Sequence, residues 1–297
     1  MRILLLFISS FLYFATASAA FVAKRFTYGA FLVILAGLSG EALALPEGNT
    51  LLLGVNEGTS GSANFFERQE KYKGLAEYLE RTLKKTVRLE SAQNLSSLTA
   101  NLKNSRYDLL FVRPSHISAK AMRDQNYTLV ASAKGDAHTY FIVSKNSPVK
   151  QPSDIRGKRI AMPDPLAYPT RSGLAMLRDI GIVPEKENIR YFSSQEAVGY
   201  AVEKNLIDVG VIVSYSKVAK DWKTKGSPIV LESKNLPFWS IIASPKIGQN
   251  EIAKIRTALI SLQDNEAGKK IMEDIGVKSF VAGNQGAYLE LLAWVKE

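Results

Sequence analysis

Hydroxyl and guanidinium side chains gather in the segment 162–173, MPDPLAYPTRSG. Thr170, Arg171 and Ser172 follow three prolines and stand directly before Gly173. We expect them in a turn between a strand and a helix that begins after Gly173. A helix start offers unpaired N–H groups and partial positive charge, so hydroxyl donors placed there suit an anion. The alternative is a plain helix cap, which explains one hydroxyl but not the pair with its glycine. Arg171 either pairs with the ligand or points into solvent.

Two more strand ends carry polar groups of the same kind. Arg113 and Ser115 follow the apolar run YDLLFV, and Ser194 and Gln195 open an amphipathic stretch after IRYFS. The Arg113 guanidinium is a fork of donors suited to an oxyanion, or else it forms a surface salt bridge. The serines are candidate ligand donors, and a helix N-cap is the alternative for either of them.

Two tyrosines are expected near these strand ends. Tyr72 lies near the start of the first predicted helix, and Tyr215 lies at the exit of the strand IDVGVIVS. Aromatic rings at the mouth of a site shield a ligand from water. A tyrosine at helical spacing is also a common packing residue.

Signals for catalysis are thin. The sequence has no cysteine, and its two histidines, His116 and His138, have no spacing typical of a metal site or a triad. No nucleophile elbow, zinc-protease motif or phosphate-binding loop occurs. We therefore expect a binding protein rather than an enzyme, with no cofactor and no metal.

The elements that would position these residues alternate between strand and helix. From Thr50 onward, short apolar runs are separated by stretches with helical spacing, which predicts βαβ units and mostly parallel sheets in an α/β fold. Residues 94–115 and 195–214 both read as helix, turn, aspartate, buried strand and polar exit. This repeat predicts two similar lobes.

We expect the chain to cross from one lobe to the other twice. Crossings near residues 133–139 and 232–237 assign residues 45–135 plus 238–297 to lobe 1 and residues 136–237 to lobe 2. Two crossings make a hinge, and ligands of α/β proteins bind at the carboxyl ends of strands and at domain interfaces. The site is therefore expected between the lobes.

The first 44 residues predict export. A basic pair, Lys24-Arg25, precedes an apolar core and an A-x-A site that ends at Ala44, which is the pattern of a secretory signal peptide. The apolar stretch before Lys24 fits that pattern less well. Either the true start lies near Val22 or residues 1–21 are a spurious extension; a membrane anchor is the competing interpretation.

The charge is positive but dispersed. The net charge of +10 falls to +8 once residues 1–44, with three basic residues and one acid, are removed. The basic residues form no arm or cluster, so nucleic acid is not an expected partner. A mildly cationic exported protein that handles anions is the simpler interpretation.

The segment SDIRGKRIAMPDPLAYPTRSG resembles the signature of phosphate/phosphite/phosphonate-type periplasmic solute-binding proteins of ABC transporters. In that family a D-L-x-G-K turn, a strand, D-P and an S-x-S-G helix start form the oxyanion site. YDLLFVRPSH and AVEKNLID resemble further landmarks, so the similarity covers residues 51–275. It implies the two-lobed type II periplasmic-binding fold, and capture of a small oxyanion by lobe closure for delivery to a membrane permease.

The resemblance also assigns roles to particular positions. The cluster that ends at Ser172 falls on the family's hydroxyl cluster, with an arginine in place of the middle hydroxyl. Gln195 falls near a histidine of the aminophosphonate binders. Tyr215 and the Phe238–Trp239 region fall near acids that hold a substrate's amino group, and those acids are missing here. The resemblance therefore favours phosphate, phosphite or an alkylphosphonate over an aminophosphonate, and Arg171 also permits a carboxylate or another anion.

The sequence as a whole predicts a monomeric periplasmic binding protein that serves an ABC importer. One alternative is a ligand-sensing module that presents the same fold to a membrane sensor kinase. Another is a binder of a different small anion. A hydrolase is disfavoured by the lack of a nucleophile–base pair, and a ferric-ion binder by the lack of an adjacent tyrosine pair.

Overall fold

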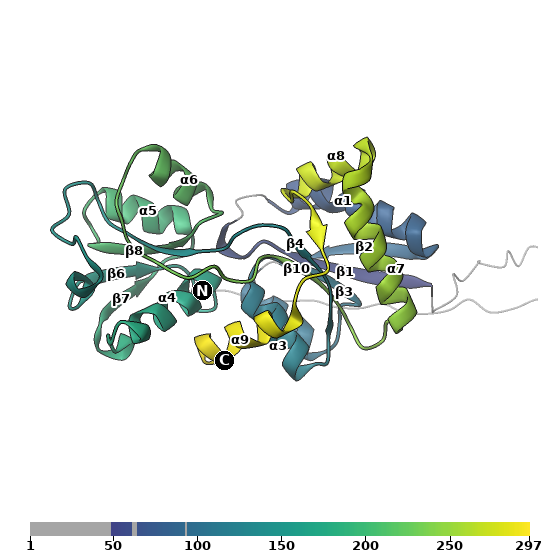
Figure 1. Ribbon diagram of the computed structural model, residues 1–297, viewed down its shortest axis with the longest axis horizontal. Coiled ribbons are helices and arrows are strands. Elements are labelled where there is room, and N and C mark those ends of the chain that lie inside the picture. The colour runs from purple at the N-terminus through teal and green to yellow at the C-terminus, as the bar shows by residue number, and fades with distance from the viewer. Residues whose placement is uncertain (1–48, 61–63, 93) are drawn as a thin grey trace, which may run out of the picture. The chain divides into compact units, whose positions relative to one another are not determined.

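Two β-sheets covered by helices organise the described part of the chain (Figure 1). The computed structural model describes residues 49–60, 64–92 and 94–297, within the unit Gly48–Glu297. The predicted signal peptide, residues 1–44, lies outside the described residues. Among the helices that are described, none is long and apolar enough to span a bilayer.

The first sheet has six strands, and we call it and its helices lobe 1. In sequence order its strands are β1 (Thr50–Asn56), β2 (Thr86–Ser91), β3 (Leu109–Val112), β4 (Thr128–Ala133), β10 (Ser240–Ala243) and β11 (Phe280–Val281). Their order across the sheet is β11-β4-β10-β3-β1-β2. β1 pairs in parallel with β2 and β3, whereas β10 is antiparallel to β3 and β4, and β11 is antiparallel to β4.

Helices cover both faces of this sheet. They are α1 (Phe65–Leu83), α2 (Leu95–Lys103), α3 (Ser115–Asp124), α7 (Gln249–Ile260), α8 (Glu266–Ile275) and α9 (Gln285–Val295), with short 3-10 turns η1 (Gly58–Ser60) and η4 (Ser261–Asp264). α1, α7 and α8 share one apolar core with the sheet, and α2, α3 and α9 share another. Neighbouring strand residues point to opposite cores: Phe111 lies in the first and Leu110 in the second.

The second sheet has five strands and forms lobe 2. Its strands are β5 (Thr139–Ile142), β6 (Arg159–Met162), β7 (Asn188–Tyr191), β8 (Val209–Val213) and β9 (Ile229–Glu232), in the spatial order β7-β6-β8-β5-β9. β6 is parallel to β7 and β8, and β5 is antiparallel to β8 and β9. Its helices are α4 (Tyr168–Asp179), α5 (Gln195–Glu203) and α6 (Lys217–Thr224), with 3-10 turns η2 (Pro152–Ile155) and η3 (Pro184–Lys186).

The predicted α/β class with two helix-covered sheets is confirmed, with more antiparallel pairing than βαβ units alone predict. β5 and β10 each enter their sheet straight after the chain passes from the other sheet. No helix precedes either strand to return the chain to the starting edge, so each runs antiparallel to its neighbours. The exact lobe boundaries stay a prediction.

The start of α4 differs from the expectation. The helix begins at Tyr168, not after Gly173, so Thr170, Arg171 and Ser172 lie in its first turns and the expected turn is wrong. Pro169 occupies the second helical position, where its fixed φ suits a helix and its missing N–H costs nothing. Pro169 is therefore compatible with a helix that begins before Gly173.

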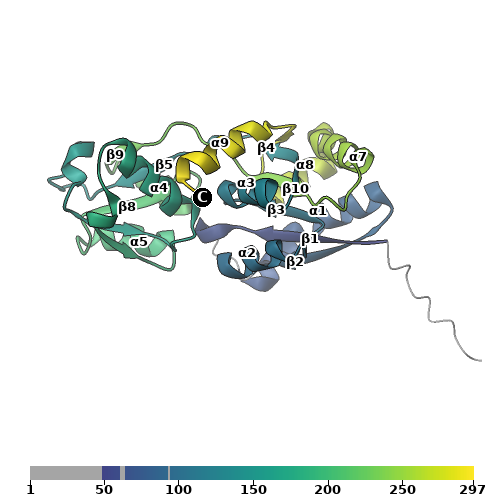
Figure 2. The same cartoon turned by 90° about the horizontal axis from the view of Figure 1, so that it is seen from below.

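Helix α9 touches both lobes (Figure 2). Tyr288 belongs to a core of lobe 1, while Leu291 and Val295 pack with Tyr168 and Val213 of lobe 2. The helix thus adds a third connection to the two chain crossings.

Candidate anion site

Charged and aromatic residues gather where β1, β3 and β8 end. Glu57 follows β1, Arg113 follows β3, and Tyr215 lies two residues beyond β8. Ligand sites of α/β folds form at such carboxyl ends. The group is called the Arg113 cluster below, and its members are Glu57, Lys71, Tyr72, Arg113, Tyr215, Phe238 and Trp239.

Glu57 is the buried carboxylate of this cluster, with a side chain 3% exposed. Its Oε1 lies 2.6 Å from Lys71 Nζ and 2.7 Å from Arg113 Nη2, and it accepts a 2.9 Å hydrogen bond from the Tyr72 hydroxyl. Burial alone would raise the pKa of Glu57, but Arg113, Lys71 and Tyr72 together outweigh burial and lower it. The carboxylate is therefore ionised at neutral pH.

Arg113 lies inside the molecule, so a surface salt bridge is the wrong interpretation for it. The residue is 8% exposed, and its guanidinium carbon lies 4.1 Å from the centre of the Trp239 ring. Within the described residues its Nε has no hydrogen-bond partner. A buried, unpaired N–H on a cation is costly, and an anionic oxygen would satisfy it.

The two predicted tyrosines differ in their surroundings. Tyr72 is 1% exposed and packs edge-on against Phe111, so it belongs to the core of lobe 1. Tyr215 comes from lobe 2 and packs edge-on against Phe238 and Trp239, with ring centres 5.5 and 5.3 Å apart. Burial raises the pKa of Tyr215, although Arg113 and Trp239 act in the opposite direction, so the hydroxyl stays protonated.

Ser115 lies in the first turn of α3, and its hydroxyl is already occupied. Its Oγ donates to the carbonyl oxygens of Pro237 and Phe238 at 2.8 and 3.0 Å. This contact joins α3 to the chain segment that enters β10. In this conformation Ser115 cannot also donate to an anion.

The hydroxyls of α4 are occupied in the same way. Thr170 Oγ1 donates to Pro163 O at 3.2 Å, and Ser172 Oγ donates to Tyr168 O at 2.7 Å. Ser172 also shares a 2.5 Å hydrogen bond with Thr139 Oγ1. Both serve local structure here.

Gly173 has a packing role. A Cβ added there would lie 2.8 Å from Val211 Cγ1, so the glycine lets α4 pack closely on β8. The contact between helix and strand therefore accounts for a glycine at this position, and its predicted place in the ligand site stays a prediction.

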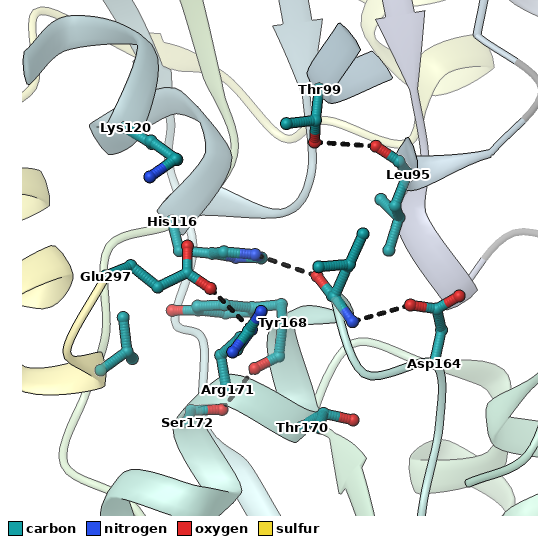
Figure 3. A network of polar contacts seen from close by, with 12 residues as sticks. Leu95, Thr99, His116, Lys120, Asp164, Tyr168, Thr170, Arg171, Ser172 and Glu297 are labelled. Atoms are coloured by element: carbon teal, nitrogen blue, oxygen red, sulfur yellow. Dashed lines mark hydrogen bonds and ion pairs between the residues drawn. The ribbon is translucent and has the colours of Figure 1, made fainter. Parts of the chain in front are cut away.

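Arg171 is not a member of the Arg113 cluster; it lies beside Glu297, with His116 and Tyr168 nearby (Figure 3). Its Nε lies 2.6 Å from Glu297 Oε1, and the two side chains form an ion pair. The Nε makes no hydrogen bond with any of the described residues. Nearby, His116 stacks on Tyr168 with rings 4° from parallel, and its Nε2 donates to Leu166 O at 3.0 Å. Arg171 therefore does not point into open solvent. Its ion pair with Glu297 is separate from the hydrogen bonds that Thr170 and Ser172 make.

Ser194 and Gln195 open α5 with different roles. Ser194 is the N-cap and accepts a 3.2 Å hydrogen bond from Ala197 N, as the capping alternative predicts. Gln195 is 1% exposed; its Oε1 accepts from Val213 N at 2.8 Å and its Nε2 donates to Thr59 Oγ1 at 3.3 Å. Gln195 thus links lobe 2 to η1 of lobe 1.

The structure brings together Tyr72, Arg113 and Tyr215 of the predicted residues. Glu57 was not predicted as a site residue, although a charged residue directly after a buried strand is a signal for one. Glu297 was also missed, and no pattern in the sequence indicates its contact with Arg171. Across the residues that are described, no group of three or more His, Cys, Asp or Glu side chains is placed to hold a metal ion.

Solved structures of several binding proteins share this architecture. XAC2383 from Xanthomonas citri, bound to ATP, superposes with a TM-score of 0.71 at 16% identity over 84% of this chain and 97% of that one. PhnD1 from Prochlorococcus marinus, in complex with methylphosphonate, gives 0.69 at 12% identity over 84% and 97%. A binding protein component of an ABC phosphonate transporter from Pseudomonas aeruginosa gives 0.64 at 12% identity over 83% and 85%. At these identities the likeness shows the fold. No curated protein sequence matches the chain.

The fold and the site define a two-lobed binding protein of the type II periplasmic class. The family model for the periplasmic substrate-binding protein of phosphonate ABC transporters matches residues 67–288, and the chain belongs to this family. The predicted resemblance and the predicted binding role are thereby confirmed. The family consists of transport proteins of the periplasm and not of enzymes.

Proposed function

We propose that the chain captures a small oxyanion of the phosphonate, phosphite or phosphate type between its lobes and delivers it to the permease of an ABC importer. The observation that carries this proposal is Arg113, a buried guanidinium at the end of β3 whose Nε lacks a partner among the described residues. Trp239 contacts both this guanidinium and Tyr215 of the opposite lobe. An anion held there would touch both lobes.

The charge of the Arg113 cluster supports an anionic ligand. Arg113 and Lys71 are cations and Glu57 is a carboxylate, which leaves one positive charge in a largely buried site. A small anion would neutralise this excess, and a charge-assisted hydrogen bond to the Arg113 Nε would satisfy the unpaired donor.

The other predicted ligand residues take secondary places in this proposal. The hydroxyls of Ser115, Thr170 and Ser172 donate to backbone carbonyls, so they would reach an anion only after the lobes rearrange. Ligand roles for Tyr72, Gly173, Ser194, Gln195 and Tyr215 also stay predictions. Arg171 is left out of the cleft because it pairs with Glu297.

Titration calorimetry with methylphosphonate, phosphite, phosphate and sulfate tests the ligand class. We expect at least one of the first three to bind, and Arg113→Lys to weaken that binding about tenfold because the Nε donor is lost. Arg156→Lys, on the surface of lobe 2, is the matched control and should bind like the parent protein. Absence of heat with all four anions would refute the oxyanion assignment.

The proposal includes export and a monomeric state. Amino-terminal sequencing of the periplasmic fraction should begin at Leu45, after cleavage at Ala44, and an intact Met1 would contradict it. Light scattering of the purified protein should give the mass of one chain.

A further inference from the structure

A cavity with apolar walls and several charged side chains lies away from the Arg113 cluster. It has a volume of about 200 Å³, below the roughly 300 Å³ at which pockets for drug-sized ligands begin. It lies between α2, α3 and the beginning of α4, and none of Glu57, Arg113 and Tyr215 lines it. Its apolar wall is formed by Leu102, Ile117, Ala121 and Leu166.

The cavity is rich in positive charge. Lys103, Lys120 and Arg171 line it, and Glu297 is the carboxylate among its lining residues. Lys120 has a loose 3.4 Å ion pair with Asp124, and Lys103 has no carboxylate partner among the described residues. Positive charge therefore exceeds negative charge beside the apolar wall.

The side chain of Glu297 already places a carboxylate in this cavity. Its side chain is 13% exposed, and its carboxylate lies 2.6 Å from Arg171 Nε. In the view of Figure 3 this carboxylate lies between Lys120 and Arg171. The Arg171 Nε is buried and makes no hydrogen bond with the described residues. Glu297 therefore neutralises the charge of Arg171 but does not accept a hydrogen bond from its Nε–H.

His116 forms part of the cavity wall and is uncharged. It lines the cavity, and burial, together with Arg171 and Lys120, lowers its pKa to about 3 against the opposing effect of the Leu166 carbonyl. The ring is therefore neutral at physiological pH, and the attraction for an acid comes from the lysines and Arg171.

We propose that this cavity is a second binding site, for a small monocarboxylic acid with an apolar body. The acid group displaces the Glu297 carboxylate and pairs with Arg171 and Lys120, while the body packs against Leu102, Ile117 and Leu166. A carboxylate on an apolar stem is the chemistry that Glu297 itself presents there. This site is separate from the proposed oxyanion site and takes a different class of ligand.

Calorimetry with benzoate and hexanoate tests the site, with benzamide as the uncharged control. Glu297→Gln should bind benzoate several-fold more tightly because the internal competitor is neutral. Arg171→Met and Lys120→Met should each weaken benzoate binding about tenfold. Lys254→Met, an exposed change on α7, should leave it unchanged. Benzamide should not bind.

Several outcomes would overturn the second site. They are no benzoate or hexanoate binding even to Glu297→Gln, equal binding of benzamide, and unchanged affinity in both Arg171→Met and Lys120→Met when circular dichroism shows both folded. Competition between methylphosphonate and benzoate would also overturn it, because the two ligands would then share one site. Failure of methylphosphonate alone to bind would count only against the proposed oxyanion function.

Discussion

Among individual residues, Glu57 is the carboxylate that connects several members of the Arg113 cluster. It holds Lys71, Tyr72 and Arg113 through a single carboxylate oxygen. A buried carboxylate shared by two cations is favourable only while every partner is in place, because each charge has lost its water. Glu57 therefore fixes the position of the Arg113 guanidinium, the proposed donor to the anion.

Replacing Glu57 with glutamine should destabilise the fold. Glu57→Gln leaves Arg113 and Lys71 without their counter-ion, and the free energy of unfolding should fall by about 3 kcal/mol. Urea unfolding followed by circular dichroism measures this loss. Glu77→Gln, an exposed change on the neighbouring helix α1, should alter stability by less than about 0.5 kcal/mol. Equal stability of Glu57→Gln and the parent would mean that the carboxylate is not needed.

Among the secondary-structure elements, α4 shows most clearly how packing and sequence motif combine. Its S-x-S-G-like start supplies hydroxyls to backbone carbonyls and a glycine to the contact with β8. The same residue types that predict an anion site also build the first turns of a tightly packed helix. Both uses require small side chains at the same positions.

Gly173→Ala should separate α4 from β8. The new methyl group would lie 2.8 Å from Val211 Cγ1, and such overpacking costs about 1–3 kcal/mol, less up to about 1 kcal/mol gained in helix propensity. Val211→Ala removes the clashing methyl, so the double mutant should be more stable than the sum of the two single effects. Urea unfolding of all four proteins gives the coupling, and strict additivity would contradict the contact.

For the molecule as a whole, a few contacts join the lobes in the conformation seen here. His116 donates to Leu166 O, and Gln195 donates to Thr59 Oγ1. Helix α9 adds a hydrogen bond of 2.8 Å from Trp294 Nε1 to Asp179 of lobe 2. These hydrogen bonds add to the apolar packing of Leu291 and Val295 of α9 against lobe 2.

His116 makes the stability of the molecule depend on pH. Burial, with Arg171 and Lys120, lowers the pKa of His116 to about 3, whereas an unfolded chain takes up the proton near pH 6.5. Between these values the unfolded state binds more protons, so stability is lost as pH falls. The free energy of unfolding should drop by about 2 kcal/mol between pH 6.5 and pH 5 on account of this residue.

Urea unfolding at the two pH values measures the effect. His116→Phe keeps a ring to stack on Tyr168 but cannot titrate, so its stability should change by about 2 kcal/mol less than that of the parent over the same interval. His138→Gln is the control and should retain the His116 contribution. An identical pH dependence in the parent and in His116→Phe would show that His116 is not buried and neutral.

Much of the fold follows from local patterns. The alternation of strand and helix predicted the α/β class, and the repeated helix–turn–strand pattern predicted two sheets, because buried strands and amphipathic helices depend on neighbouring residues. The start of α4 was placed too late, since its first turns carry polar and proline residues instead of an apolar stripe. The antiparallel strands β5 and β10 were not foreseen because pairing between distant strands leaves no local signal.

The site was predicted only in part. Tyr72, Arg113 and Tyr215 could be nominated from their places near strand ends and helix starts, but whether their side chains meet depends on the whole fold. The occupied hydroxyls of Ser115, Thr170 and Ser172 could not be foreseen, because their acceptors are carbonyls whose positions the tertiary structure sets.

The segment 162–173 shows where the two kinds of information divide. Its residue types alone indicate a family signature and a helix start, because prolines, hydroxyls and a glycine carry strong local preferences. Only the folded chain decides which way each side chain points. Successive helical residues face different directions, so Thr170 turns back to Pro163 while Arg171 reaches Glu297, a residue more than a hundred positions away.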